Sequence, residues 1–187
     1  METTYDQIVD RDTIDYLGLD PRGLARVLDS GVDHGGNPIE PFTDYEGGWP
    51  LRCCLADSCP GDLIAIIAFS PFSWRSPYRE TGPVVVHATG CPGHDGRFPV
   101  QFEGRDQVLR AFGDDAGRVN TQVYDQHRLV RAGDGLAAAI EAILADPRVR
   151  EVHAHNVISQ CFSFAATAAR VGSSAPLLQP RADTAQG

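Results

Sequence analysis

Two histidines, an asparagine and a cysteine lie close together near the end of the chain, in the segment "HAHNVISQC". In a strand alternate side chains share a face, so His153 and His155 point to one side and Asn156 to the other. An imidazole can act as acid or base near neutral pH, and it can activate a cysteine when an amide orients it. We therefore treat His155 and Cys161 as candidate catalytic residues and Asn156 as a candidate substrate-binding residue.

A transition metal ion is a second interpretation of the same histidines. Two imidazoles at positions i and i+2 of a strand, here His153 and His155, can bind one ion. His87, at the end of "PVVVH", adds a third ligand if the strands are neighbours, and Cys161 or Cys91 a fourth. The cofactor would then be zinc or iron, whereas without a metal we expect His87 to bind substrate. Ordinary buried or solvated histidines are the alternative to both.

The segment "SPYRETGP" places three hydrogen-bonding side chains in a short loop. Pro77 and Pro83 bracket Tyr78, Arg79 and Glu80, so the loop is rigid and borders an apolar segment. We expect Arg79 and Glu80 to take part in catalysis and Tyr78 to bind substrate. The alternative is an exposed Arg–Glu pair, which contributes little to stability.

The segment "LRCCL" places a guanidinium beside two thiols. Arg52 can lower a thiol pKa or hold a carboxylate, so it is a candidate substrate-binding residue. Adjacent cysteines in a strand point to opposite faces, so at most one of Cys53 and Cys54 faces a site, and we interpret both as structurally buried. The absence of a CxxC repeat argues against a zinc ribbon. Five cysteines, an odd number, and a polar N-terminus predict a cytoplasmic protein without a disulfide framework.

Composition excludes several functional classes. The chain has 187 residues, 42% of them hydrophobic, and a net charge of −9, which disfavours nucleic acid and anionic membranes as partners. No stretch approaches the ~18 apolar residues that cross a bilayer. All 16 basic residues are arginine, so lysine Schiff-base chemistry and a phosphate-loop lysine are excluded.

Hydrophobic patterns predict the elements that position these residues. Asp20, Pro21 and Gly31 are typical of the ends of a helix over 20–31, and a second helix is predicted over 133–147. Strands are predicted at 62–70, buried on both faces, and at 83–89. A hairpin is predicted from "QVLRAF" and "RVNTQVYD", and two further strands from "VREVHAHNV" and "CFSFAATAA". This order predicts an α+β fold, with a mostly antiparallel sheet and one main helix packed on it. We expect a single domain over 1–170 and a flexible C-terminal tail over 171–187.

The ordered blocks "LRCCL…PGD", "PYRETGPVVVH", Cys91, Arg105 with "LRAF", and "HAHN…CF" resemble the bacterial family catalogued as domain of unknown function 1203. The resemblance covers roughly residues 40 to 170. In that family the last block often reads His-Asn followed by Gly-Cys, whereas this chain has Gln160 before Cys161. The resemblance implies a compact α+β fold and no particular activity. It supports treating the candidate residues as one set, which comprises Arg52, Pro77, Tyr78, Arg79, Glu80, His87, His155, Asn156 and Cys161.

The candidate residues together suit a small, anionic ligand if they meet at one concavity. We expect a cofactor-independent small-molecule enzyme that uses His, Arg and Cys acid–base chemistry on an oxygenated or anionic substrate. The GC-rich composition suggests bacterial secondary metabolism, and a homodimer is compatible with the sequence. The two alternatives are a metal-dependent enzyme with a His-rich site and a non-enzymatic ligand-binding or interaction domain.

Overall fold

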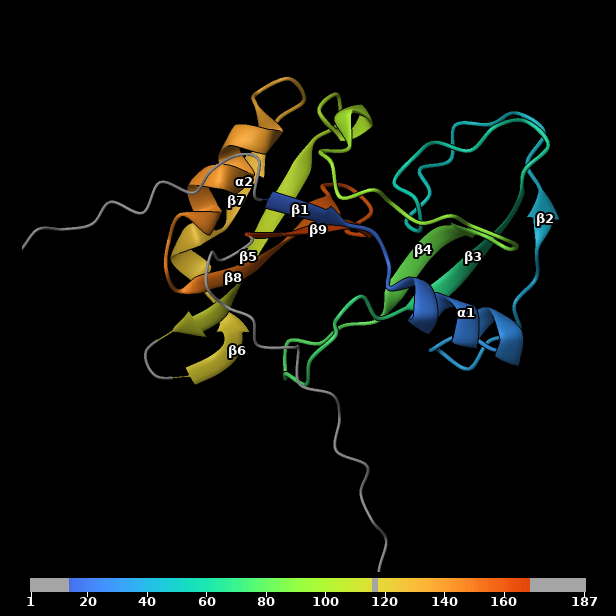
Figure 1. Cartoon of the computed structure of the whole chain (residues 1–187), viewed down its shortest axis with the longest axis horizontal. Coiled ribbons are helices and arrows are strands. Elements are labelled where there is room, and N and C mark those ends of the chain that lie inside the picture. The colour runs from blue at the N-terminus through green and yellow to red at the C-terminus, as the bar shows by residue number, and fades with distance from the viewer. Residues whose placement is uncertain (1–13, 116–117, 169–187) are drawn as a thin grey trace, which may run out of the picture.

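A computed structural model describes residues 14–115 and 118–168 (Figure 1). The predicted domain over 1–170 begins and ends outside these residues, and the predicted tail at 171–187 lies wholly outside them. The described chain forms two antiparallel sheets and two α-helices, which confirms the predicted α+β class. The sequence predicted one sheet, whereas the structure has two.

The larger sheet has six strands and holds the "HAHN" segment at its centre. Its main path runs in the order β1 (Ile14–Leu17), β9 (Phe162–Ala168), β8 (Val149–Asn156), β5 (Gln107–Asp115) and β6 (Arg118–Gln122). The sixth strand, β7 (Arg128–Val130), pairs with the N-terminal part of β5, beyond the part that pairs with β6. The predicted hairpin corresponds to β5 and β6. The 3₁₀ helices η2 (Val100–Phe102) and η3 (Tyr124–Gln126) lie in the connections.

Helix α2 (Leu136–Leu144) covers one face of this sheet (Figure 1). Four of its side chains are buried against β5, β8 and β9, and they are Leu136, Ile140, Ile143 and Leu144. Each contributes roughly 1.5–3 kcal/mol by its burial. The N-cap residue of α2 is Gly135, and the capping oxygen comes from Glu103, whose carboxylate accepts hydrogen bonds from the N–H groups of Gly135 and Leu136 at 2.9 and 3.0 Å.

The smaller sheet consists of β2 (Phe42–Thr43), β3 (Leu63–Phe69) and β4 (Gly82–His87). Helix α1 (Pro21–Ser30) packs beside it, and the helix begins as predicted, with the Asp20 carboxylate accepting the N–H of Gly23 at 2.8 Å. The helix ends at Gly31, whose φ of 69° suits glycine.

Strand β3 was predicted to be buried on both faces, but its burial is incomplete: Leu63 is 40% and Ile66 50% exposed, whereas Ile64 and Ile67 are buried. The buried residues of β3 join a second hydrophobic core with α1, and Phe162 and Ala165 of β9 complete that core. Strand β9 therefore contributes to both cores. This shared strand brings the "LRCCL" loop and the start of β9 together.

Candidate metal centre

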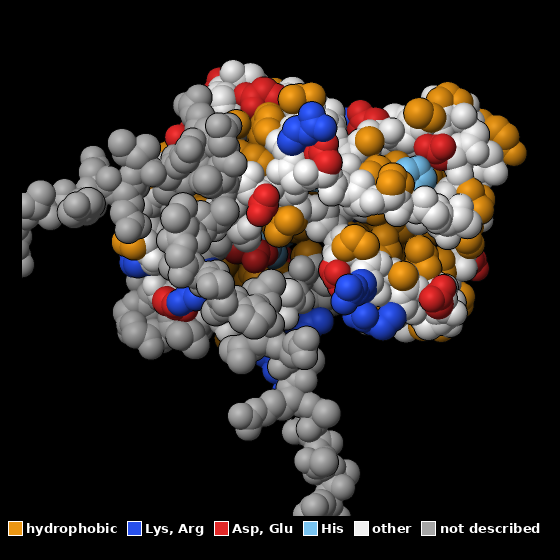
Figure 2. Space-filling view, in the orientation of Figure 1, with side chains coloured by type: hydrophobic (Ala, Val, Ile, Leu, Met, Phe, Trp, Pro, Cys, Tyr) orange, Lys and Arg blue, Asp and Glu red, His pale blue; other side chains and the backbone are white. Residues whose placement is uncertain are grey.

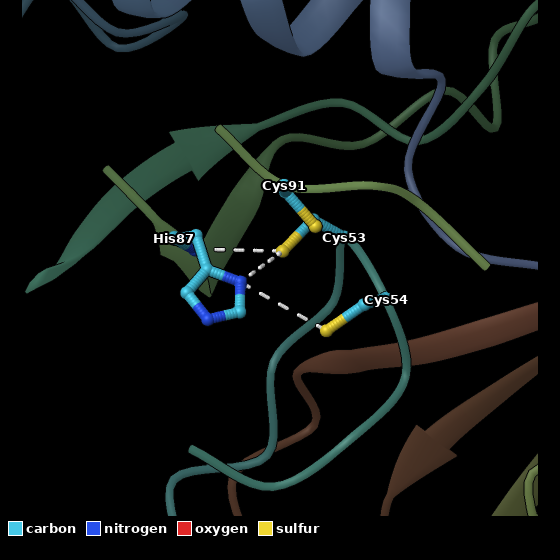
Figure 3. A group of neighbouring side chains, drawn as sticks. All are labelled: Cys53, Cys54, His87 and Cys91. Carbon is cyan, nitrogen blue, oxygen red and sulfur yellow. Dashed lines mark hydrogen bonds between the residues drawn. The ribbon is translucent and has the colours of Figure 1, made fainter. Parts of the chain in front are cut away.

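One group of side chains in the described part of the chain could hold a metal ion: Cys53, Cys54, His87 and Cys91 (Figure 3). Their ligand atoms all lie within 4.8 Å of one another. Nδ1 of His87 lies 3.6 Å from Sγ of Cys53 and 3.9 Å from Sγ of Cys54. Ligands at tetrahedral zinc, with bonds of about 2.3 Å to sulfur and 2.0–2.1 Å to nitrogen, lie about 3.6 to 3.8 Å apart. The group therefore matches a Cys₃His zinc site after a small inward shift of its widest pair.

The two adjacent cysteines lie in a turn rather than in a strand. The N–H of Leu51 donates to the carbonyl of Ala56 at 2.8 Å, and Leu55 has a φ of 58°. Both thiols consequently face His87, which corrects the expectation that at most one of them faces a site. The backbone N–H of Arg52 donates to the carbonyl of Val85 at 2.8 Å and thereby docks the turn beside β4.

Backbone N–H groups support the sulfur atoms. The N–H of His87 donates to Sγ of Cys53 at 3.4 Å, and that of Gly93 donates to Sγ of Cys91 at 3.5 Å. The hydrogen bond from Cys53 lowers the pKa of the Cys54 thiol to about 5. The same bond, together with burial, raises the pKa of Cys53. The N–H of His87 acts against this rise, because N–H donors stabilise thiolate, which is the form that binds metal.

Asp62 orients the imidazole of His87. Its Oδ2 lies 3.4 Å from Nε2 of His87 and accepts the N–H of Cys59 at 2.8 Å. Metal-ligating histidines usually turn their second nitrogen to a carboxylate in this way, which fixes the ring and its tautomer. Nδ1 of His87 is thus left free to face the sulfur atoms. A cavity of about 180 Å³ between α1 and this group is lined by Cys53, His87 and Cys91.

The predicted catalytic residues His155 and Glu80 lie together and are not part of the group that contains His87. Nε2 of His155 is 3.7 Å from Oε1 of Glu80, and Arg110 forms an ion pair with the same carboxylate. Burial lowers the pKa of His155 to about 4. His153 instead contacts Glu151, with Nε2 2.5 Å from Oε1. The structure groups His87 with three cysteines, so the predicted set of His87, His153 and His155 does not meet at one point.

Arg52 is held by backbone carbonyl groups. Arg52 is buried, and its Nε donates to the carbonyl of Phe162 at 2.5 Å while its NH1 donates to that of Pro50. Burial lowers the pKa of Arg52 to about 10. Arg52 thus joins the turn that carries Cys53 to the first residue of β9.

The side chains of the remaining predicted site residues form contacts within and between loops. Arg79 is exposed and donates from Nε to Oγ of Ser70 at 3.0 Å. Tyr78 packs edge-on against Tyr124, with ring centroids 6.1 Å apart. Oδ1 of Asn156 accepts the N–H of Ile158 at 3.0 Å, which closes the turn between β8 and β9 rather than orienting an imidazole.

Sequence reasoning missed Cys53 and Cys54 as candidate ligands. It also missed Asp62, which contacts His87, and Arg110, which pairs with Glu80. The spacing of His87 and Cys91, four residues apart around Gly90, was the available signal for a metal-binding turn. No sequence pattern indicated Arg110, because its role depends on a loop that arrives from Glu80.

The fold and the Cys₃His group define the class: an α+β protein with a potential metal-binding turn. Residues 48–168 match the family described as "Protein of unknown function (DUF1203)", and the chain belongs to this family. The match includes all four residues of the Cys₃His group, and the same family was indicated by the sequence blocks. No curated protein and no solved structure matches the chain.

Helix length and the distribution of surface charge bear on the partners of the protein. No helix in the described ranges is long and apolar enough to cross a membrane. On the face shown in Figure 2, basic side chains lie in separate groups, interspersed with acidic and hydrophobic ones.

Proposed function

We propose that this protein binds one zinc ion through Cys53, Cys54, His87 and Cys91. The observation that carries this proposal is the approach of four ligand atoms to within 4.8 Å of one another. Three thiolates and one imidazole favour zinc among the divalent ions of the cell. Because side chains fill all four positions, the site is of the closed, structural kind.

The ion would cross-link segments that have little regular structure of their own. The turn at 51–55, the end of β4 and the segment after Thr89 would be tied at one point. In small metal-binding segments the free energy of binding the ion contributes directly to folding. Zinc would thereby hold the turn that carries Arg52 against β9.

The test is the metal content and coordination of the purified full chain. We expect one equivalent of zinc by elemental analysis, and thiolate-to-metal charge-transfer absorption after cobalt replaces the zinc. Cys54→Ser and Cys91→Ser should each lose most of the metal. Cys59→Ser is the matched control, because Cys59 is exposed and outside the group. Protein that binds neither zinc nor cobalt at micromolar concentrations would overturn the proposal.

We also propose a cytoplasmic location. Thiols bind metal only while they are reduced, and the five free cysteines support a reducing compartment. Cell fractionation tests this location. Homodimer formation stays a prediction, which sedimentation velocity of the zinc-loaded protein checks.

A further inference from the structure

His155 is a buried histidine, and one of its two ring nitrogens already forms a hydrogen bond. It lies on β8, at the centre of the larger sheet, and its side chain is 3% exposed. Nδ1 lies 3.0 Å from the carbonyl oxygen of Gln160. A carbonyl can only accept, so Nδ1 carries the hydrogen and donates it. In the neutral ring the lone pair is therefore on Nε2.

Among the residues that the structure describes, none forms a hydrogen bond with Nε2 of His155. The nearest carboxylate oxygen, Oε1 of Glu80, lies 3.7 Å away and is also an acceptor. Arg110 holds that carboxylate in place. Leaving a buried polar group unsatisfied costs about 1–3 kcal/mol, so the arrangement favours a group that donates a hydrogen bond to Nε2.

The residue that orients His155 has an unusual backbone. Gln160 has a φ of 58°, a conformation that residues other than glycine rarely adopt. This conformation lies in the turn that aims the Gln160 carbonyl at Nδ1. Strained residues of this kind concentrate at functional sites, where the surrounding structure maintains them. The backbone conformation of Gln160 and the unpartnered Nε2 are two separate observations, and both concern the imidazole of His155.

The surroundings of the orphan nitrogen are aromatic on one side and polar on the other. The ring of Phe162 packs edge-on against His155, with centroids 5.9 Å apart, and His153 stacks beside it at 6.2 Å. The Glu80 side chain, which lies nearest to Nε2, is 41% exposed.

We propose that His155 and Glu80 form a binding site for a small molecule that carries a hydroxyl group on an apolar or aromatic frame, with the hydroxyl donating to Nε2 of His155. The frame packs on Phe162, and Arg110 keeps the Glu80 carboxylate beside the imidazole. If the hydroxyl proton moves to Nε2, the bond to oxygen breaks, the ligand keeps the electron pair, and the imidazolium faces Glu80. The site is separate from the proposed zinc centre. The proposal for His155 therefore holds whether or not the protein binds zinc.

The test uses phenol as the probe and the zinc-loaded full chain. Long-range proton–nitrogen correlation spectra follow the imidazole nitrogens during a titration. We expect a saturable shift of Nε2 of His155, because this nitrogen gains a hydrogen-bond donor. Anisole, which replaces the hydroxyl by a methoxy group, is the matched ligand and should leave Nε2 unchanged.

Variants separate the site from general adsorption. His155→Phe should weaken phenol binding by about three- to tenfold, measured from the amide shift of Phe162, because one hydrogen bond is lost. Glu80→Gln should also weaken it, because the amide can itself donate to Nε2. Glu40→Gln is the control on an exposed carboxylate and should bind as the parent does. The proposal is wrong if phenol leaves Nε2 unmoved up to its solubility limit, or if anisole shifts it equally.

Discussion

The imidazole of His87 depends on a single carboxylate for its orientation. Asp62 lies 3.4 Å from Nε2 on the side opposite the three sulfur atoms. Loss of such an outer partner typically weakens metal binding by about 10- to 100-fold. We expect this loss of zinc affinity in Asp62→Ala, measured by competition with a chromophoric chelator. Asp106→Ala removes a carboxylate that pairs with Arg131, outside the Cys₃His group, and it should leave the affinity unchanged. Equal affinities in all three proteins would show that Asp62 does not support a ligand.

The candidate site residues could be predicted from the sequence only in part. It indicated His87 and Cys91 as metal ligands within one alternative, but grouped them with histidines of another strand. Cys53 and Cys54 were assigned opposite faces by strand periodicity, which fails because they lie in a turn. His155 and Glu80 do lie together, yet Asn156, expected to bind substrate, caps a turn. Side chains from distant segments meet through tertiary packing, which local spacing does not encode.

At the scale of elements, the connection between β1 and α1 supports the cysteine turn. A Cβ at Gly18 would lie 2.7 Å from the carbonyl oxygen of Arg52 and 2.8 Å from that of Cys53. These are backbone atoms, so the turn itself must shift. The N–H of Leu19 also donates to the carbonyl of Arg52 at 2.8 Å. Gly18 thus allows the close approach that positions the first ligand.

Gly18→Ala should therefore impair the protein in two ways. Crowding of this kind typically costs about 1–3 kcal/mol of unfolding free energy, measured by urea denaturation. The displaced carbonyl of Cys53 should also weaken zinc binding. Gly104→Ala is the matched control, because nothing lies within 4 Å of its added Cβ. If both variants resemble the parent, the β1–α1 connection is not coupled to the turn.

At the scale of the whole molecule, the sequence predicted the fold class but not the division of the strands into two sheets. Alternating and periodic patterns identified both helices and the main strands, and they begin and end close to the predicted residues. The patterns do not specify which strands pair. The division into two sheets arises because β3 pairs with β4 and β2, while β9 pairs with β1 and β8. Strand β9 then packs in both cores, a tertiary feature that alternation alone cannot express.

Two of the groups with shifted pKa values should make the stability of the whole molecule depend on pH in separate ranges. Burial lowers the pKa of His155 to about 4, from an ordinary value near 6.5. The unfolded chain then binds more protons than the folded one, so stability falls as the pH drops from 6.5 to 4. Glu80 opposes this effect, whereas the charges of Arg110 and His153 add to it. The shift corresponds to a contribution on the order of 3 kcal/mol.

Asp33 acts at lower pH. Hydrogen bonds from the backbone N–H groups of Ala68 and Asn37 lower its pKa to about 2, from 3.8. This group stabilises the folded state above pH 3.8, and the stabilisation is lost as the pH falls towards 2. The two windows meet near pH 4, so variants can separate them.

Urea denaturation of the zinc-loaded protein at a series of pH values tests both contributions. Relative to the parent, His155→Phe should flatten the decline between pH 6.5 and 4, because it removes the buried base. Asp33→Asn should leave that window unchanged and flatten the decline below pH 4. Zinc release at low pH affects parent and variants alike, so the difference between them isolates each group. A parent and a His155→Phe variant with parallel profiles from pH 6.5 to 4 would mean that His155 titrates normally. It would then be protonated, and unable to accept a ligand's hydroxyl hydrogen, over much of the mildly acidic range.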